Sequence, residues 1–279
     1  MKLTFSNEMG TLNLYGSGGH DFTICEIEGL EPCEKNRSLK TYVGEDGSFE
    51  DSSQYTSRVI TISGDIKSES NFMNIFKNTA RVLSKEGVLT VYRDNSLRQI
   101  TVNSASITIG KRYNTYCTYV IQLTCDYPHF RDINTTFDSV FELTKMLTSA
   151  TALPSVLSVR KSIGTIYNSG DLKIYPIIKI SKSVDVSGAN KIIIKNNTTE
   201  KEITLEKELL KDEIITIDTK NRTITSSIDG NIMSSLDFYS SLSEFWLECG
   251  NNDIEISVDG LYSDITVTAE YYNEYLEAL

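Results

Sequence analysis

Residues 118–127, TYVIQLTCDY, indicate the fold class because apolar and polar side chains alternate along them. Successive side chains of a β-strand point to opposite faces, so such alternation predicts a strand with one buried side. The same period appears in RVITISGDI (58–66), where Ile60 and Ile62 share one face. In TYVIQLTCDY, the buried face would carry Tyr119, Ile121, Leu123 and Cys125. The opposite face would carry Val120, Gln122 and Thr124. A mainly β fold is therefore expected.

One segment departs from this period. In SESNFMNIFKNTARVLSKEG (68–87) the apolar residues recur three and four positions apart, after serine caps and before Gly87. This spacing predicts one helix at 70–86 with Gly87 at its end. A hairpin turning at Asp94–Asn95 is expected next, within GVLTVYRDNSLRQITVNSASITI.

Residues 36–57, NRSLKTYVGEDGSFEDSSQYTS, lack clear alternation and are rich in Gly, Ser, Asp and Glu. A loop of this length is uncommon in a compact domain, so the segment is either disordered or held by contact with something else. Its spaced aromatic residues, Tyr42, Phe49 and Tyr55, favour a contact arm.

The second half of the chain has eight strand-like stretches separated by turn sequences. This spacing is typical of an antiparallel β-sandwich of jelly-roll or lectin-like form. We expect an N-terminal domain at 1–135, a Ser/Thr-rich connection at 136–160 and a sandwich at 161–279.

Trp246 is the only tryptophan of the chain. Alternation in SEFWLECG (243–250) predicts a strand with Phe245, Leu247 and Cys249 on its buried face and Trp246 on the other. Asn251–Asn252 would form a hairpin turn, and Ile254, Ile256 and Val258 the inner face of the return strand. Contact with the other domain or a neighbouring subunit is the preferred explanation for an outward Trp246; sugar stacking and a bulge that buries it are the alternatives.

Residues able to do chemistry are sparse. The two histidines, His20 and His129, have no catalytic or metal-binding pattern around them, and the five cysteines are odd in number without a C-x-x-C. Cys125 and Cys249 are expected to be small buried residues. The acidic run EKEITLEKELLKDE (200–213) is interleaved with lysines, which favours a solvated face over a glycosidase carboxylate pair. Neither an enzyme, a cofactor nor a metal is expected.

The net charge is −11 and unevenly spread. Residues 1–135 hold 14 Lys and Arg against 16 Asp and Glu, and residues 136–279 hold 13 against 22. Neither half has the basic patch that nucleic-acid binding requires. Like-charged surfaces repel, so the near-neutral half is expected to contact identical copies. The sequence shows no signal peptide and no apolar stretch of membrane-spanning length, so we expect synthesis in a cytoplasm and no membrane insertion.

The ordered set of these segments resembles phage distal tail proteins over nearly the whole chain. The N-terminal resemblance is carried by MKLTFSNEMG, CEIEGLEP, YVGEDGSF with TSRVITISGDI, the helix, GVLTVYRDNSLRQITV and YVIQLTCDYPHF; the C-terminal one by NKIIIKNNTTEKEITL, DEIITIDTKNRTI and FWLECGNNDIEI. The region around 136–160 matches the family less well.

The resemblance implies a split-barrel-like N-terminal domain with one helix, a galectin-like C-terminal sandwich and a homohexameric ring. It places the ring in a virion tail or tail-like particle, assembled in the bacterial host cytoplasm, between the tail tube protein and the tip, fibre or receptor-binding proteins. DNA would pass the lumen without specific binding. The family's arm that reaches a neighbour corresponds here to Tyr42, Gly44, Gly47, Phe49, Tyr55 and Arg58.

Two hypotheses from different classes follow. The first is a structural, non-enzymatic tail hub that works by self-association. The second is a carbohydrate-binding module in which the sandwich and Trp246 read host cell-wall glycan; a fold alone does not decide this. A wall-degrading hydrolase comes third because no carboxylate pair supports it.

Overall fold

The computed structural model describes residues 1–16, 21–44, 46–67, 72–93, 96–113, 115–141, 143–145, 158–160, 163–182, 190–259 and 265–278. His20 and the expected turn at Asp94–Asn95 lie outside the described residues. The chain forms two compact units. The first unit comprises Met1–Ile133 with Tyr275–Leu279, and the second comprises Asn134–Glu274.

The first unit is built on a ten-stranded sheet of order β24-β11-β8-β7-β1-β2-β3-β6-β10-β9. β2 and β3 make a short parallel contact, whereas the pairs β1–β2 and β6–β10 are antiparallel. The strands are β1 (Lys2–Asn7), β2 (Gly10–Tyr15), β3 (Phe22–Glu28), β6 (Arg58–Lys67), β7 (Gly87–Arg93), β8 (Ser96–Val102), β9 (Ser104–Arg112), β10 (Tyr116–Cys125), β11 (Phe130–Asp132) and β24 (Glu274–Tyr275).

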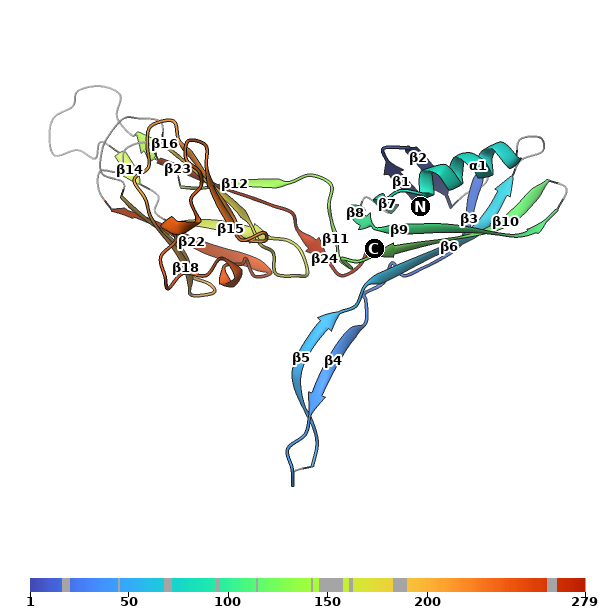
Figure 1. The fold of residues 1–279 in the computed structure, drawn as a ribbon, viewed down its shortest axis with the longest axis horizontal. Coiled ribbons are helices and arrows are strands. Elements are labelled where there is room, and N and C mark those ends of the chain that lie inside the picture. Colours follow the sequence, from blue (N-terminus) through green and yellow to red (C-terminus); the bar gives the residue numbers. More distant parts are fainter. Residues whose placement is uncertain are drawn as a thin grey trace. The chain divides into compact units, whose positions relative to one another are not determined.

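The expected helix is confirmed as α1 (Phe72–Leu83), which lies along one side of the sheet (Figure 1). It buries Phe72, Thr79, Val82 and Leu83. The helix ends before the predicted residue 86, and Gly87 starts β7 instead of capping the helix. A Cβ atom at Gly87 would lie 2.6 Å from the carbonyl oxygen of Ser6, so close passage of β1 explains this glycine.

The alternation that predicted the strands also defines the core of the first unit. Tyr119, Ile121, Leu123 and Cys125 are each at most 1% exposed and pack with Ile60 and Ile62 of β6. β10 pairs with β6 along its whole length. Burial raises the pKa of the Cys125 thiol to about 12, so this cysteine is a small apolar core residue.

The second unit is a β-sandwich. One sheet has the order β12-β23-β16-β19-β20-β21 and the other β15-β22-β17-β18, with a separate pair of β13 and β14. The strands are β12 (Thr136–Phe141), β13 (Leu143–Lys145), β14 (Ser158–Arg160), β15 (Ile163–Asn168), β16 (Ile177–Lys182), β17 (Lys191–Asn196), β18 (Lys201–Glu206), β19 (Ile214–Asp218), β20 (Thr223–Ser226), β21 (Gly230–Asn231), β22 (Gly250–Asp259) and β23 (Ile265–Tyr271). The mainly β class with one helix and an antiparallel sandwich is confirmed.

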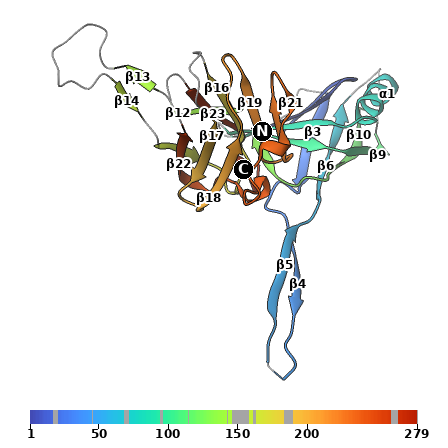
Figure 2. The ribbon, with the colours of Figure 1, turned by 60° about the vertical axis from the view of Figure 1, so that its left-hand side comes forward.

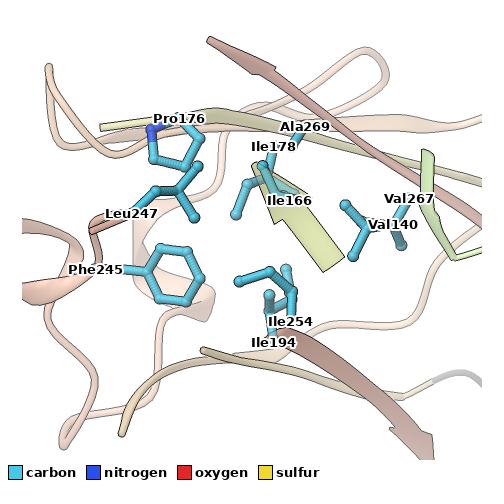
Figure 3. A pocket seen from close by; sticks show the side chains of 10 residues that line it. All are labelled: Val140, Ile166, Pro176, Ile178, Ile194, Phe245, Leu247, Ile254, Val267 and Ala269. Carbon is cyan, nitrogen blue, oxygen red and sulfur yellow. The ribbon is translucent and has the colours of Figure 1, made fainter. Parts of the chain in front are cut away.

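Apolar side chains fill the space between the two sheets of the sandwich. Figure 3 shows Phe245 and Leu247 facing Ile194 and Ile254 across a gap in this core. The gap has a volume of about 10 Å³ and a wholly apolar lining, which is about the space of one water molecule. This gap has no room for a sugar.

Two expectations for the second half differ from the structure. SEFWLECG is not a strand: it contains the 3₁₀ turn η2 (Leu242–Glu244) and a single bridge between Leu247 and Ile174. No hairpin turn forms at Asn251–Asn252, because both residues already lie within β22. Ile254, Ile256 and Val258 are buried as expected.

The ends of the second unit also differ from the expected boundaries. β12 pairs with β23, so the start of the predicted connection at 136–160 is a strand of the sandwich. Residues 146–157 of that connection lie outside the described part of the chain. Tyr275–Leu279, expected in the sandwich, belong to the first unit.

Candidate functional site: a projecting hairpin and its root

The segment predicted as an arm is a two-stranded antiparallel hairpin, formed by β4 (Lys35–Lys40) and β5 (Phe49–Tyr55). It projects away from the sheet of the first unit (Figures 1 and 2). Every residue of β4 and all of β5 except Tyr55 is exposed. Among the described residues, these two strands pair only with each other. The outer edges of the two strands and their exposed side chains are therefore open to a partner.

The far end of the hairpin carries four exposed apolar side chains, two of which stack on each other. The rings of Tyr42 and Phe49 stack with centroids 4.7 Å apart, although Tyr42 is 64% exposed. Gly44 and Gly47 have φ angles of +89° and +106°, which permit the reversal of the chain there. We call Leu39, Tyr42, Val43 and Phe49, all exposed, the arm tip.

Two pairs of opposite charges cross the strands of the hairpin. Arg37 and Glu50 approach to 2.6 Å, and so do Lys40 and Asp51. Hydrogen bonds from Ser53 and Arg37 lower the pKa of the Glu50 carboxyl group. These pairs are solvent-exposed and contribute little to stability. Within each pair the opposite charges cancel. The hairpin therefore has little net charge that could attract or repel a partner.

Aromatic contacts fix the root of the hairpin to the first unit. The rings of Tyr55 and His129 meet edge to face with centroids 4.9 Å apart, and His129 makes a similar contact with Tyr127. The ammonium group of Lys35 stands 4.9 Å from the Tyr55 ring centroid. Tyr55, predicted as a contact residue of the arm, thus packs against its own chain at the root.

Arg58 follows the hairpin and is only 2% exposed. Its guanidinium group donates to the carbonyl oxygens of Pro128 at 2.7 Å, Gly29 and Glu31 at 2.6 Å, and Leu276 at 2.7 Å. Its carbon also lies 4.7 Å from the Phe130 ring centroid. Burial lowers the pKa of this arginine from its usual range. The structure therefore corrects the expectation that Arg58 contacts a neighbour, since its own chain takes up its donors.

The last residues of the chain complete this arrangement. Arg98 donates to the carbonyl oxygen of Glu277 at 2.7 Å, and the amide of Ala278 donates to the carbonyl oxygen of Leu30 at 3.0 Å. Arg98 also stacks on Tyr275, with 3.6 Å between its guanidinium carbon and the ring centroid. Together with Arg58, these contacts hold residues 275–278 next to the segment from which the hairpin leaves. Sequence reasoning missed this junction.

Trp246, the other predicted contact residue, is half-buried in the second unit. Its indole nitrogen donates to Glu248 at 2.6 Å, and the ammonium group of Lys173 lies 4.4 Å from its ring centroid. Lys173 therefore lies over the ring, and Glu248 takes up the hydrogen bond of its nitrogen. Cys249, expected to be buried, is exposed because the segment is not a regular strand.

A buried ion pair lies in the acidic run 200–213. Glu213 is fully buried, accepts from the amide of Leu210 at 2.9 Å and from the hydroxyl of Ser226, and lies 2.7 Å from the ammonium group of Lys207. Burial would raise the pKa of Glu213, but hydrogen bonds from Lys207, Ser226 and the Leu210 amide outweigh it and lower this pKa. The predicted solvated face is thus wrong for Glu213, which holds the β18–β19 loop in place.

Within the described part of the chain, no group of three metal-ligating side chains comes together. No helix found there is long and apolar enough to span a membrane.

The comparison with protein families gives one match. Residues 169–275 match the model of the siphovirus-type tail component, C-terminal domain. This match confirms the resemblance to phage distal tail proteins. A comparison with curated protein sequences finds no match.

Solved structures of phage tails resemble the chain. The crystal structure of the Dit protein (gp 19.1) of SPP1, described as a paradigm of the hub adsorption apparatus in phages that infect Gram-positive bacteria, has a TM-score of 0.66 at 12% identity; the match covers 89% of this chain and 92% of that one. Chains of the phage P2 baseplate in its activated conformation, with calcium and with strontium, have TM-scores of 0.47 and 0.48 at 12% identity, covering 96% and 97% of the two chains. The match to the SPP1 Dit protein shows that the two chains share a fold.

Proposed function

We propose that this chain is a structural, non-enzymatic hub protein of a phage tail or tail-like particle. Six copies associate head to tail into a closed ring that joins the tail tube to the tip or receptor-binding proteins. DNA passes through the ring without specific binding. The chain acts in the tail after assembly in the host cytoplasm.

The observation that carries this proposal is the hairpin of β4 and β5. Among the described residues, no other strand pairs with β4 or β5, and the arm tip is exposed, although exposed apolar surface and unpaired strand edges are usually covered. Such a feature is explained if a neighbouring copy binds it. In a ring, each copy gives its arm to one neighbour and receives an arm from the other.

The root of the hairpin supports the same function. Arg58 and Tyr55 fix the direction in which the hairpin leaves the first unit. A fixed direction lowers the entropy that is lost on binding, because the arm is already oriented before it meets its partner. The arm residues Tyr42, Gly44, Gly47 and Phe49 are proposed to make the contact, while Tyr55 and Arg58 position it.

The experiment is replacement of residues 37–53 by Asn-Gly. This two-residue turn closes the hairpin at the paired residues Asn36 and Gln54 and leaves the root intact. We expect copies that fold normally but associate at least about 100-fold more weakly, as measured by light scattering over a concentration series. Rings that persist undiminished would contradict the proposal.

A matched pair of milder variants separates a specific contact from a general loss of apolar surface. Tyr42→Ser with Phe49→Ser removes two exposed rings from the arm. Phe238→Ser with Tyr239→Ser removes two rings from the second unit, each of which is 92% exposed. Only the first pair is expected to weaken association.

A further inference from the structure

The first unit is completed by a piece of chain that follows the second unit. It comprises Met1–Ile133 and Tyr275–Leu279, and the whole of the second unit lies between these two pieces in the sequence. β24, which includes Tyr275, is the edge strand of the ten-stranded sheet and lies next to β11. We call residues 275–278 the closing segment. The first unit therefore has all of its strands only after the chain has returned to it.

The closing segment belongs to the interior of the first unit. Ala278 is fully buried in the apolar core of this unit, and Tyr275 packs against the same core. The guanidinium carbon of Arg98 lies 3.6 Å from the Tyr275 ring centroid, and the hydroxyl of this tyrosine donates to the carboxylate of Asp132 at 3.4 Å. Release of the segment therefore leaves a gap among apolar side chains.

The same segment holds the root of the hairpin on both of its sides. After β5, Arg58 donates to the carbonyl oxygen of Leu276 at 2.7 Å, while another of its nitrogens donates to two carbonyl oxygens before β4. Before β4, the carbonyl oxygen of Leu30 accepts from the amide of Ala278 at 3.0 Å. Without the segment these groups lose their partners, and unpaired buried polar groups are costly. The direction of the hairpin is therefore fully fixed only when the closing segment is in place.

Synthesis of the chain separates the hairpin from the closing segment in time. The hairpin is made before residue 133, whereas the closing segment follows Asn134–Glu274. At about 5–20 residues per second, synthesis of the second unit takes roughly 7–30 s. During this interval the chain has an exposed arm tip and no closing segment, and unfinished chains with exposed apolar surface are prone to aggregate. An arm that binds poorly before the segment returns avoids such premature association.

We propose that the closing segment is an assembly check: the arm takes up its binding direction only after the second unit has been made and the chain has returned to the first unit. The inference rests on the proposed function and adds a control on when the arm binds. Its physical basis is the entropy lost on binding, which is smaller for an arm already held in one direction. Copies that lack a second unit also lack the closing segment, so they are kept out of the assembly.

The test loosens the closing segment in the full chain without changing the arm. Ala278→Asp places a carboxylate in the apolar core, which is costly enough to displace the segment. Arg98→Met is the milder variant, because it removes only the hydrogen bond to the carbonyl oxygen of Glu277 and the stacking on Tyr275. Arg81→Met, on the exposed side of α1, is the matched control.

Two measurements are made on each variant. Light scattering over a concentration series measures association, and hydrogen exchange resolved by segment shows whether the closing segment is released while the first unit stays folded. We expect faster exchange of the amide at position 278, continued protection of β10, and association at least about 10-fold weaker than that of the wild type in both variants. The control should assemble normally.

Three results would overturn the inference. The first is rings that form with wild-type affinity although the amide at position 278 exchanges fast, because the segment then only adds stability. The second is unchanged protection of that amide in both variants, and the third is a loss of protection across β10 in Arg98→Met. In each case, loss of rings on replacement of residues 37–53 leaves the proposed function standing. A wild-type chain that remains monomeric overturns the proposed function itself.

Discussion

Replacing Arg58 with methionine is expected to destabilise the first unit by about 3–5 kcal/mol. Hydrogen bonds that involve a charged group each contribute about 1.5–3 kcal/mol, and Arg58 makes four of them to backbone oxygens. Methionine preserves much of the apolar volume but leaves these oxygens without their donor. The loss is therefore larger than that of a surface substitution.

Lysine at position 58 is not expected to restore the wild type. The guanidinium group is a planar fork that reaches carbonyls on several sides, whereas an ammonium group is a point charge with three donors. Arg58→Lys should keep the positive charge yet lose most of the stabilisation. This variant separates the geometry of the contacts from the charge.

The measurement is hydrogen exchange under native conditions, resolved by segment. We expect faster exchange of the Ala278 amide, which is bonded to Leu30, and of the hairpin root, while the fluorescence of Trp246 reports an unchanged second unit. Arg81→Met, on the exposed side of α1, is the matched control and should change stability by less than about 0.5 kcal/mol. Unchanged protection of Ala278 in Arg58→Met would contradict this role.

Replacing Glu213 with glutamine is expected to destabilise the second unit by about 3 kcal/mol, near the lower end of the cost of breaking a buried ion pair. The effect lies at the lower end because Lys207 keeps its contact with Asp229 at 3.0 Å. Urea unfolding followed by Trp246 fluorescence measures it. Glu208→Gln, an exposed change of the same charge in the same loop, should be nearly neutral.

The same residue makes stability depend on pH. The pKa of Glu213 is lower in the folded chain than in the unfolded one, so its contribution is fully present above the unfolded value of about 4.3. It is lost as the pH falls through the lowered folded pKa. Below about pH 4.5, wild-type stability should therefore fall more steeply than that of Glu213→Gln. Parallel pH profiles for the two proteins would show that Glu213 does not act in this way.

The strands of both cores could be predicted because one of their faces is buried. Burial on one side leaves a two-residue period in the sequence, as in β6, β10 and β23. β4 and β5 leave no such period because both of their faces are exposed, so the sequence indicated an unusual segment but not a hairpin. SEFWLECG shows the opposite error: its alternation is real at Phe245 and Leu247, yet the backbone there forms a 3₁₀ turn and one bridge.

The junction at Arg58 could not be predicted, because its partners come from distant parts of the chain. Gly29, Pro128 and Leu276 are 29, 70 and 218 positions away. All of them contribute backbone oxygens, which every residue possesses and which no motif reveals. For Glu213, interleaved lysines suggested a solvated face, and only the fold shows that one of them, Lys207, meets this carboxylate away from water.

The central claim is that the chain assembles as a closed ring through its first unit. Native mass spectrometry of the purified full-length protein tests it most directly, combined with negative-stain images of the same sample. The account predicts a dominant particle of about 188 kDa, six times the 31.3 kDa of one chain, with a central opening. A single species at the mass of one chain, even at high concentration, would contradict it.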